Sequence, residues 1–171
     1  FDQFVKLLPL LAPGGQLLFS CYFEPTLHPQ FLKFLETVPE EFRRLGAFTT
    51  NLAKRLPDRY FKDLAQLGLH HVNVSLDSLD PAVFEEMREK VRFEVFNENL
   101  DRLVAALSSE SLRTEVRFIS MVSKLNLEEI PSLIRQCAER YQPARHEVRS
   151  IWMTEEIENR PWMKQNALSL E

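Results

Sequence analysis

Apolar and polar positions along this chain follow two rhythms, which predict helices and strands in turn. Apolar residues recur at helical spacing in residues 1–11, 29–38, 57–68, 93–107 and 126–141. Between these segments lie five stretches typical of strands, residues 16–23, 43–51, 70–78, 113–123 and 145–153. A further helix is expected to begin at Pro81, with Asp80 as its cap. Strands that alternate with helices predict an α/β fold with a parallel sheet.

One predicted strand is polar on a single face. In the sequence VNVSLDS, residues 72–78, the apolar side chains share one face, and Asn73, Ser75 and Asp77 share the other. A solvated sheet edge and the wet lumen of a barrel both produce this pattern. Because helices flank the strand in the sequence, we favour the lumen.

Polar residues also follow the other predicted strands. Glu24 stands at the end of an apolar strand, and Thr50 and Asn51 end the next one, while the fourth strand carries Arg117. In barrels of parallel strands, ligands bind at the C-terminal ends of the strands. The first strand is followed by EPTLHP, which is neither a Rossmann fingerprint nor a P-loop, so an ordinary nucleotide fold is disfavoured.

Four motifs, in this order, resemble those of the radical S-adenosylmethionine superfamily. CYFEPTLHPQF (21–31) resembles the second-strand motif of the family, and FTTNLA (48–53) its third-strand Thr-Asn segment. LAQLGLHHVNVSLDSLDPAVFEEMR (64–88) resembles the stretch through the fourth strand, and FNENLDRLVAAL (96–107) the helix after it. The resemblance covers about residues 1–150.

The resemblance implies a partial (β/α)6 TIM-like barrel of parallel strands, truncated at its N-terminal strand. We expect residues 1–153 to form this domain, and residues 154–171 to be a tail or the start of a C-terminal extension. The implied cofactors are S-adenosylmethionine and a 4Fe-4S cluster, which together start radical chemistry on a substrate, a small molecule or a peptide, that the sequence does not identify. An external electron donor is the implied partner.

The same resemblance implies roles for six residues at the strand ends. Glu24 would meet the ammonium of S-adenosylmethionine, and Thr50 and Asn51 would bond its methionine part. Ser75 would contact the ribose or methionine part, and Arg117 would pair with the carboxylate. Asp77 is also a candidate. Plainer alternatives stay open: Glu24 as a solvated acid, Asn51 as a turn residue, Asp77 as a helix cap and Arg117 as a surface cation.

Two features depart from the family pattern. The three-cysteine cluster motif C-x3-C-x2-C is absent, and neither Cys21 nor Cys137 replaces it, so no metal ligand is expected in this chain. Tyr22 and Phe23 stand where the family has two glycines. Since the sequence begins with Phe1, we expect a fragment that starts just downstream of the cluster loop and is inactive by itself.

Composition sets limits on the function. The formal net charge is −4 with no basic run, so there is no nucleic-acid signature, and no apolar run approaches the length of a membrane span. Two distant cysteines match neither a disulfide scaffold nor a zinc site, which favours the cytoplasm. The alternatives are a non-catalytic, degenerate α/β barrel module that binds a ligand or protein partner, and an aldolase-like barrel, for which Lys124 is the nearby lysine.

Overall fold

A single parallel sheet organises the chain. The structure, a computed structural model, describes residues 1–10, 15–19, 23–109, 114–151 and 160–168. Its five strands are β1 (Leu17–Leu18), β2 (Gly46–Thr50), β3 (His71–Ser75), β4 (Glu115–Val122) and β5 (Arg145–Ser150). They lie side by side in sequence order, and every neighbouring pair is parallel. The predicted α/β fold is therefore confirmed.

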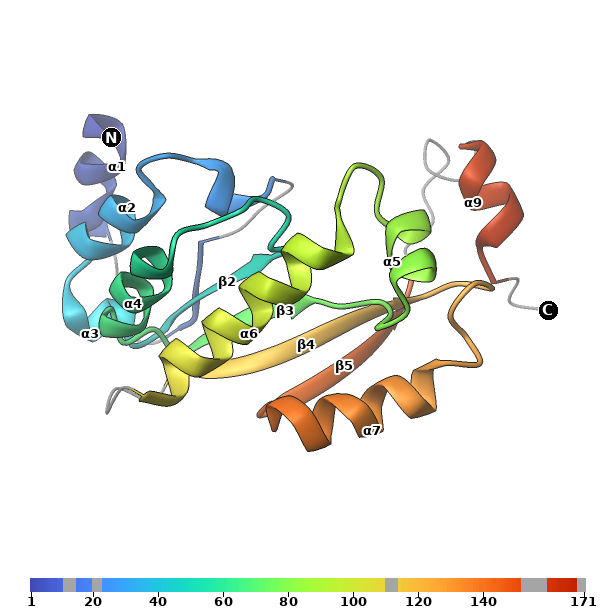
Figure 1. The fold of residues 1–171 in the computed structure, drawn as a ribbon. Coiled ribbons are helices and arrows are strands. Elements are labelled where there is room, and N and C mark those ends of the chain that lie inside the picture. Colours follow the sequence, from blue (N-terminus) through green and yellow to red (C-terminus); the bar gives the residue numbers. More distant parts are fainter. Residues whose placement is uncertain (11–14, 20–22, 110–113, 152–159, 169–171) are drawn as a thin grey trace.

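Helices that connect the strands cover one face of this sheet. The described helices are α1 (Asp2–Leu7), α2 (Phe31–Thr37), α3 (Glu40–Arg43), α4 (Asp58–Gln66), α5 (Pro81–Met87), α6 (Phe93–Ser109), α7 (Ile130–Tyr141) and α9 (Pro161–Asn166), with 3-10 turns η1 (Leu8–Leu10) and η2 (Pro25–Leu27). Strands that follow each other in order, joined by crossovers of one hand, place their connecting helices on the same side. Figure 1 shows α4 and α6 lying across that face.

The two faces of the sheet differ in chemistry. On the helix side, Phe48, Val72, Val74 and Phe118 are buried in the apolar core. The opposite face carries the alternate residues, among them Asn73, and it lines an open cavity rather than the core. The polar face that the sequence predicts for the third strand is therefore the concave side of a barrel-like sheet.

Local signals placed several helix boundaries correctly. Asp80 Oδ1 accepts hydrogen bonds from the amides of Ala82 and Val83, and Pro81 is the first residue of α5. Gly68 follows α4 with a φ of 64°, a conformation that suits glycine. The sequence predicts a helix from residue 126, with Asn126 as its cap, but α7 begins at Ile130 and the side chain of Asn126 is buried in the preceding turn.

Other details differ from the sequence prediction. Strand β1 has two residues, and Cys21 lies outside the described residues. The expected boundary between residues 153 and 154 also falls outside them, so the division into domains stays a prediction. Helix α3 was not predicted. Its Arg43 donates hydrogen bonds to the carbonyl oxygens of Glu36, Val38 and Leu67, which satisfies acceptors at the ends of α2 and α4.

In the described part of the chain, no helix combines the length and the apolar character needed to span a bilayer.

Candidate functional site

Glu24 is bound tightly at the C-terminal end of β2. Its Oε1 accepts hydrogen bonds from the hydroxyl of Thr50 at 2.6 Å and from the hydroxyl and amide of Thr26 at 2.6 and 3.1 Å. Its Oε2 accepts one from the amide of Asn51 at 2.6 Å. The carboxylate thus joins the turn η2 to the end of β2, and it caps η2 as well. Of the predicted site residues, the structure brings Glu24, Thr50 and Asn51 together.

The loop after β2 is held in an unusual conformation beside this carboxylate. Leu52 has a φ of 49° although its side chain is buried, and its amide donates to Thr50 Oγ1 at 3.0 Å. Asn99, buried on α6, donates through Nδ2 to the carbonyl oxygens of Leu52 and Lys54 at 2.9 and 2.7 Å. A left-handed leucine costs free energy that the surrounding contacts must offset. Asn99 is therefore a positioning residue for this loop.

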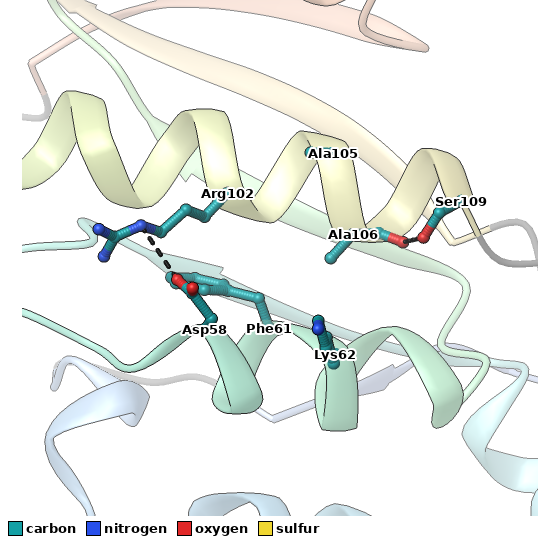
Figure 2. Close-up of a pocket in the computed structure, with 7 residues that line it drawn as sticks. All are labelled: Asp58, Phe61, Lys62, Arg102, Ala105, Ala106 and Ser109. Carbon is teal, nitrogen blue, oxygen red and sulfur yellow. Dashed lines mark hydrogen bonds and ion pairs between the residues drawn. The ribbon is translucent and has the colours of Figure 1, made fainter.

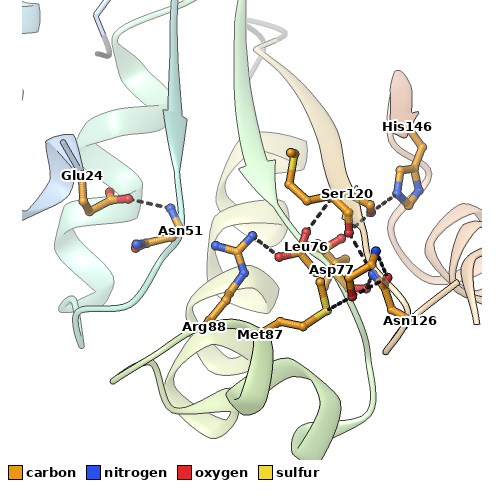
Figure 3. A network of polar contacts seen from close by, with 11 residues as sticks. Glu24, Asn51, Leu76, Asp77, Met87, Arg88, Ser120, Asn126 and His146 are labelled. Atoms are coloured by element: carbon orange, nitrogen blue, oxygen red, sulfur yellow. Dashed lines mark hydrogen bonds and ion pairs between the residues drawn. The ribbon is translucent and has the colours of Figure 1, made fainter. Parts of the chain in front are cut away.

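Asp77 forms a second polar cluster at the end of β3. Its Oδ2 pairs with Nη2 of Arg88 at 2.6 Å, and the two side chains are only 5% and 15% exposed. Its Oδ1 accepts the amide of Met121, and its backbone oxygen accepts Nδ2 of Asn126, both at 2.8 Å. Figure 3 shows the guanidinium of Arg88 between the Glu24–Asn51 pair and Asp77 in that view. Asp77 does not cap α5, because Asp80 does so.

Ser75 and Arg117 lie apart from these two clusters. Thr50 pairs with Val74 in the sheet, so Asn51 and Ser75 follow at the same level of neighbouring strands. The hydroxyl of Ser75 makes no hydrogen bond within the described chain. Arg117 pairs with Asn73, which lies two residues before Ser75 on β3. Arg117 therefore lies about 6.5 Å further from the strand ends than Ser75 does. Its guanidinium is held by Glu115 at 2.6 and 3.0 Å, so the structure does not bring Arg117 to the strand ends.

The open face of the sheet is hollowed into a cavity of about 350 Å³. Strands β1 to β5 all contribute to its lining, which contains Gln16, Leu18, Thr49, His71, Asn73, Arg117, Phe118, Ile119, Arg145, Glu147 and Arg149. We call it the lumen cavity. It lies on the open face below the strand ends, at which barrels of parallel strands bind their ligands.

A serine and a histidine meet elsewhere in the fold without forming a usable nucleophile. Ser120 Oγ lies 2.8 Å from Nε2 of His146 and also bonds the carbonyl oxygen of Leu76. Ser120 is fully buried, and burial lowers the pKa of His146. This pair supports the sheet from the inside rather than facing a ligand.

A different cavity of about 350 Å³ lies on the outer side of the helices, in a groove between α4 and α6 (Figure 2). Phe61 forms its floor, and Asp58 pairs with Arg102 across it at 3.2 Å. None of its lining residues belongs to the predicted site, and it supports no proposal.

Comparison with known proteins places these features in a family context. No protein-family model matches the chain. GTP 3',8-cyclase of Chlorobaculum tepidum is 34% identical over 139 residues, which cover 75% of this chain and 38% of that protein. The tungsten-containing aldehyde ferredoxin oxidoreductase cofactor-modifying protein of Pyrococcus furiosus is 29% identical over 143 residues and is also covered to 38%. The chain thus spans about two fifths of the length of these relatives.

Solved structures share the fold at low identity. The structure described as "Native anSMEcpe with bound AdoMet" has a TM-score of 0.61 at 14% identity and matches 87% of this chain and 41% of its own. Coproporphyrinogen III oxidase of Escherichia coli, described as a radical SAM enzyme, has a TM-score of 0.55 at 13% identity and matches 91% and 36%. The chain belongs to the radical S-adenosylmethionine superfamily. Its five parallel strands match the partial barrel of these radical SAM proteins.

The described strand ends fit S-adenosylmethionine. Oε2 of Glu24 accepts one hydrogen bond, so a lone pair remains for an ammonium. The hydroxyl of Ser75 and Nδ2 of Asn51 have no hydrogen-bond partner within the described chain, although Oδ1 of Asn51 accepts the amide of Ala53 in a turn. Asn51 thus serves the turn through one atom and leaves the other for a ligand. The ligand roles of all six predicted residues remain predictions.

The residues present do not fit a 4Fe-4S cluster. Such a cluster needs several cysteine thiolates, and the sequence has only Cys21 and Cys137. Cys137 is fully buried in α7, where burial raises the pKa of its thiol to about 12. Among the described residues, no group of three or more histidines, cysteines and carboxylates could hold a metal ion.

Sequence reasoning missed three residues that shape the site. Arg88 is the last residue of the longest family-like motif, and Asn99 interrupts the apolar face of a predicted helix, so both left a signal. Thr26 follows Pro25 in a turn, and nothing in the sequence signals its role. The partners of Asn99 lie 45 and 47 positions away in the sequence, and that of Arg88 lies 11 positions away, which local patterns do not reveal. Thr26, in contrast, bonds Glu24 only two residues earlier.

Proposed function

We propose that this chain is the S-adenosylmethionine-binding barrel portion of a radical SAM enzyme, which cleaves S-adenosylmethionine reductively to start radical chemistry on a substrate in the lumen cavity. The observation that carries the proposal is the carboxylate of Glu24, fixed beside Thr50 and Asn51 at the C-terminal end of a family-type parallel sheet. A non-catalytic module would not need a half-buried acid, held by four hydrogen bonds and with an unused lone pair, at this position.

The residues of this chain bind and orient the ligand. Glu24 accepts the ammonium, and its hydrogen bonds to Thr50 and Asn51 fix the direction of the carboxylate. A charge-assisted bond of this kind is stronger than a neutral one, especially where water is excluded. Ser75 donates or accepts at the methionine or ribose part from the neighbouring strand. The Asp77–Arg88 pair keeps the end of β3 and α5 in place around the ligand.

For the complete enzyme, the proposal includes cluster ligands that lie outside this chain, an external electron donor and a location in the cytoplasm. The 171-residue chain alone is expected to be inactive, because its own residues do not supply a cluster site.

The proposal is tested by S-adenosylmethionine binding and cleavage in the protein that carries this chain. After anaerobic reconstitution with iron and sulfide, dithionite should release 5'-deoxyadenosine, measured by chromatography. Glu24→Gln should weaken S-adenosylmethionine binding about ten- to a hundredfold in calorimetry, the equivalent of roughly 1.5–3 kcal/mol. Glu41→Gln, at an exposed acid on α3, is the matched control. Binding that is unchanged in Glu24→Gln, or no 5'-deoxyadenosine, contradicts the proposal.

A nucleotide cyclisation is the second candidate for the complete reaction. It is favoured by the relatives named GTP 3',8-cyclase, which are 26–36% identical to this chain. The test adds GTP to the reconstituted enzyme and searches for a cyclised product by mass spectrometry. Turnover of S-adenosylmethionine without any change in GTP would assign the enzyme a different substrate.

A further inference from the structure

Four polar side chains form one row across the open face of the sheet. The strand register places Thr49 opposite Asn73, Asn73 opposite Arg117, and Arg117 opposite Arg145. All four line the lumen cavity. Nδ2 of Asn73 donates to Thr49 Oγ1 at 3.4 Å, so this end of the row is already linked. We call these four residues the lumen row.

The two arginines of the row are neighbours with the same charge. Glu115 holds the guanidinium of Arg117 from two residues earlier on the same strand. Arg145 has no hydrogen bond or ion pair within the described chain. Like charges directly opposite each other on adjacent strands are destabilising. The sheet thus carries a repulsion at this point that a bound anion would relieve.

Other charged residues around the cavity limit the charge that this anion can carry. Arg149 is held by Glu147 through two hydrogen bonds of 2.9 Å. Glu147 also attracts Arg145, on the same strand, although the two form no ion pair within the described residues. The three arginines therefore share two carboxylates, Glu115 and Glu147, which leaves one net positive charge. His71 adds none at neutral pH, since burial, with Arg117 and His70, lowers its pKa to about 4. A group with several negative charges would meet the carboxylates of Glu115 and Glu147.

We propose that the lumen row binds the anionic end of the substrate, a single carboxylate or phosphate group seated between Arg117 and Arg145. The inference rests on the proposed function, because it treats the lumen cavity as the substrate site. Two guanidinium groups offer the forked donors that suit either oxyanion, and Asn73 adds an amide donor on one side. The cavity of about 350 Å³ fits a small molecule.

The experiment measures anion binding in the protein that carries this chain. Acetate, inorganic phosphate and tripolyphosphate are titrated separately, with the arginine Nε–Hε resonances observed by NMR. Acetate or phosphate should bind with a dissociation constant that Arg145→Gln raises about tenfold or more. Arg145→Lys should keep part of the affinity. Arg135→Gln, at an exposed arginine of α7 with no ion pair in the described chain, should change nothing.

The pattern of results separates the possible outcomes. Stronger binding of acetate assigns a carboxylate and stronger binding of phosphate a phosphate group; either supports the proposal. It is overturned if neither binds, if Arg135→Gln has the same effect, or if tripolyphosphate binds far more tightly than phosphate.

Two further measurements guard against a structural effect and against failure of the proposed function. Arg145→Gln should leave Tm unchanged or raise it, because it removes the repulsion; a clear fall in Tm would contradict the proposal. S-adenosylmethionine binding, which depends on Glu24, should be the same in Arg145→Gln. A failed Glu24 test with an intact anion effect would overturn the proposed function alone.

Discussion

The buried pair of Asp77 and Arg88 offers a sharp test of how the strand ends are held. Arg88→Met removes the cation and keeps much of the volume of the side chain. It leaves the carboxylate of Asp77 at 5% exposure with a single remaining side-chain hydrogen bond, from the amide of Met121. A buried carboxylate that loses its partner is strongly unfavourable, since water cannot replace the lost interaction.

The expected loss can be worked from these contacts. Removing one partner of a buried ion pair typically costs about 3–5 kcal/mol. We expect the lower part of this range, about 3 kcal/mol, because the bond to Met121 remains and because Arg88 is 15% exposed. This is a large fraction of the roughly 5–15 kcal/mol that stabilises a domain. Adding Asp77→Asn should restore much of the loss, since the amide keeps an oxygen for Met121 and carries no charge.

Urea unfolding, followed by circular dichroism, measures these changes in a double-mutant cycle. Arg44→Met is the matched control, because its pair with Glu40 is about 60% exposed on both sides and should contribute less than about 1 kcal/mol. The reasoning is refuted if Arg88→Met costs no more than Arg44→Met. It is refuted equally if the double variant loses the full sum of the two single losses.

Further predictions concern other residues of the fold. Asn99→Asp should lower the free energy of unfolding by about 2–5 kcal/mol in urea, because two loop carbonyl groups lose their donor; Asn97→Asp, which keeps the oxygen that accepts from a tyrosine, should change it by less than about 1 kcal/mol. Gly46→Ala should cost about 1–3 kcal/mol, since its Cβ would lie 2.7 Å from an aromatic carbon and 2.8 Å from a backbone oxygen; an unchanged melting temperature would contradict this. The pKa of His71 is lowered to about 4, so the unfolded chain binds the proton first as pH falls from 6.5 to 4; stability should decrease across that window, and His71→Gln should flatten part of the slope in pH-dependent melting curves. In a Cys21→Ser background, Cys137 should react with a thiol reagent only after unfolding, and rapid labelling of the native protein would show that it is accessible.

The sequence by itself determined the order of elements and the character of the sheet. Helical and strand periodicities reflect backbone geometry and burial, both of which act over a few residues, so alternation alone predicted parallel strands. The same alternation assigned Asn73 and Ser75 to the open face. Local stop and start signals, such as Gly68 and Asp80, work through hydrogen bonds and backbone conformation within one turn, and they were correct for the same reason.

Only the tertiary structure decided which polar groups meet. Arg88 finds Asp77 across a helix, and Asn99 reaches a loop more than 40 residues away, so neither partner could be read from spacing. Arg117 was expected at the strand ends, but the register places it two residues deeper and opposite Arg145. A side chain's partner depends on strand register and on the approach of distant segments. These follow from packing of the whole sheet, whereas periodicity records only which side of an element is buried.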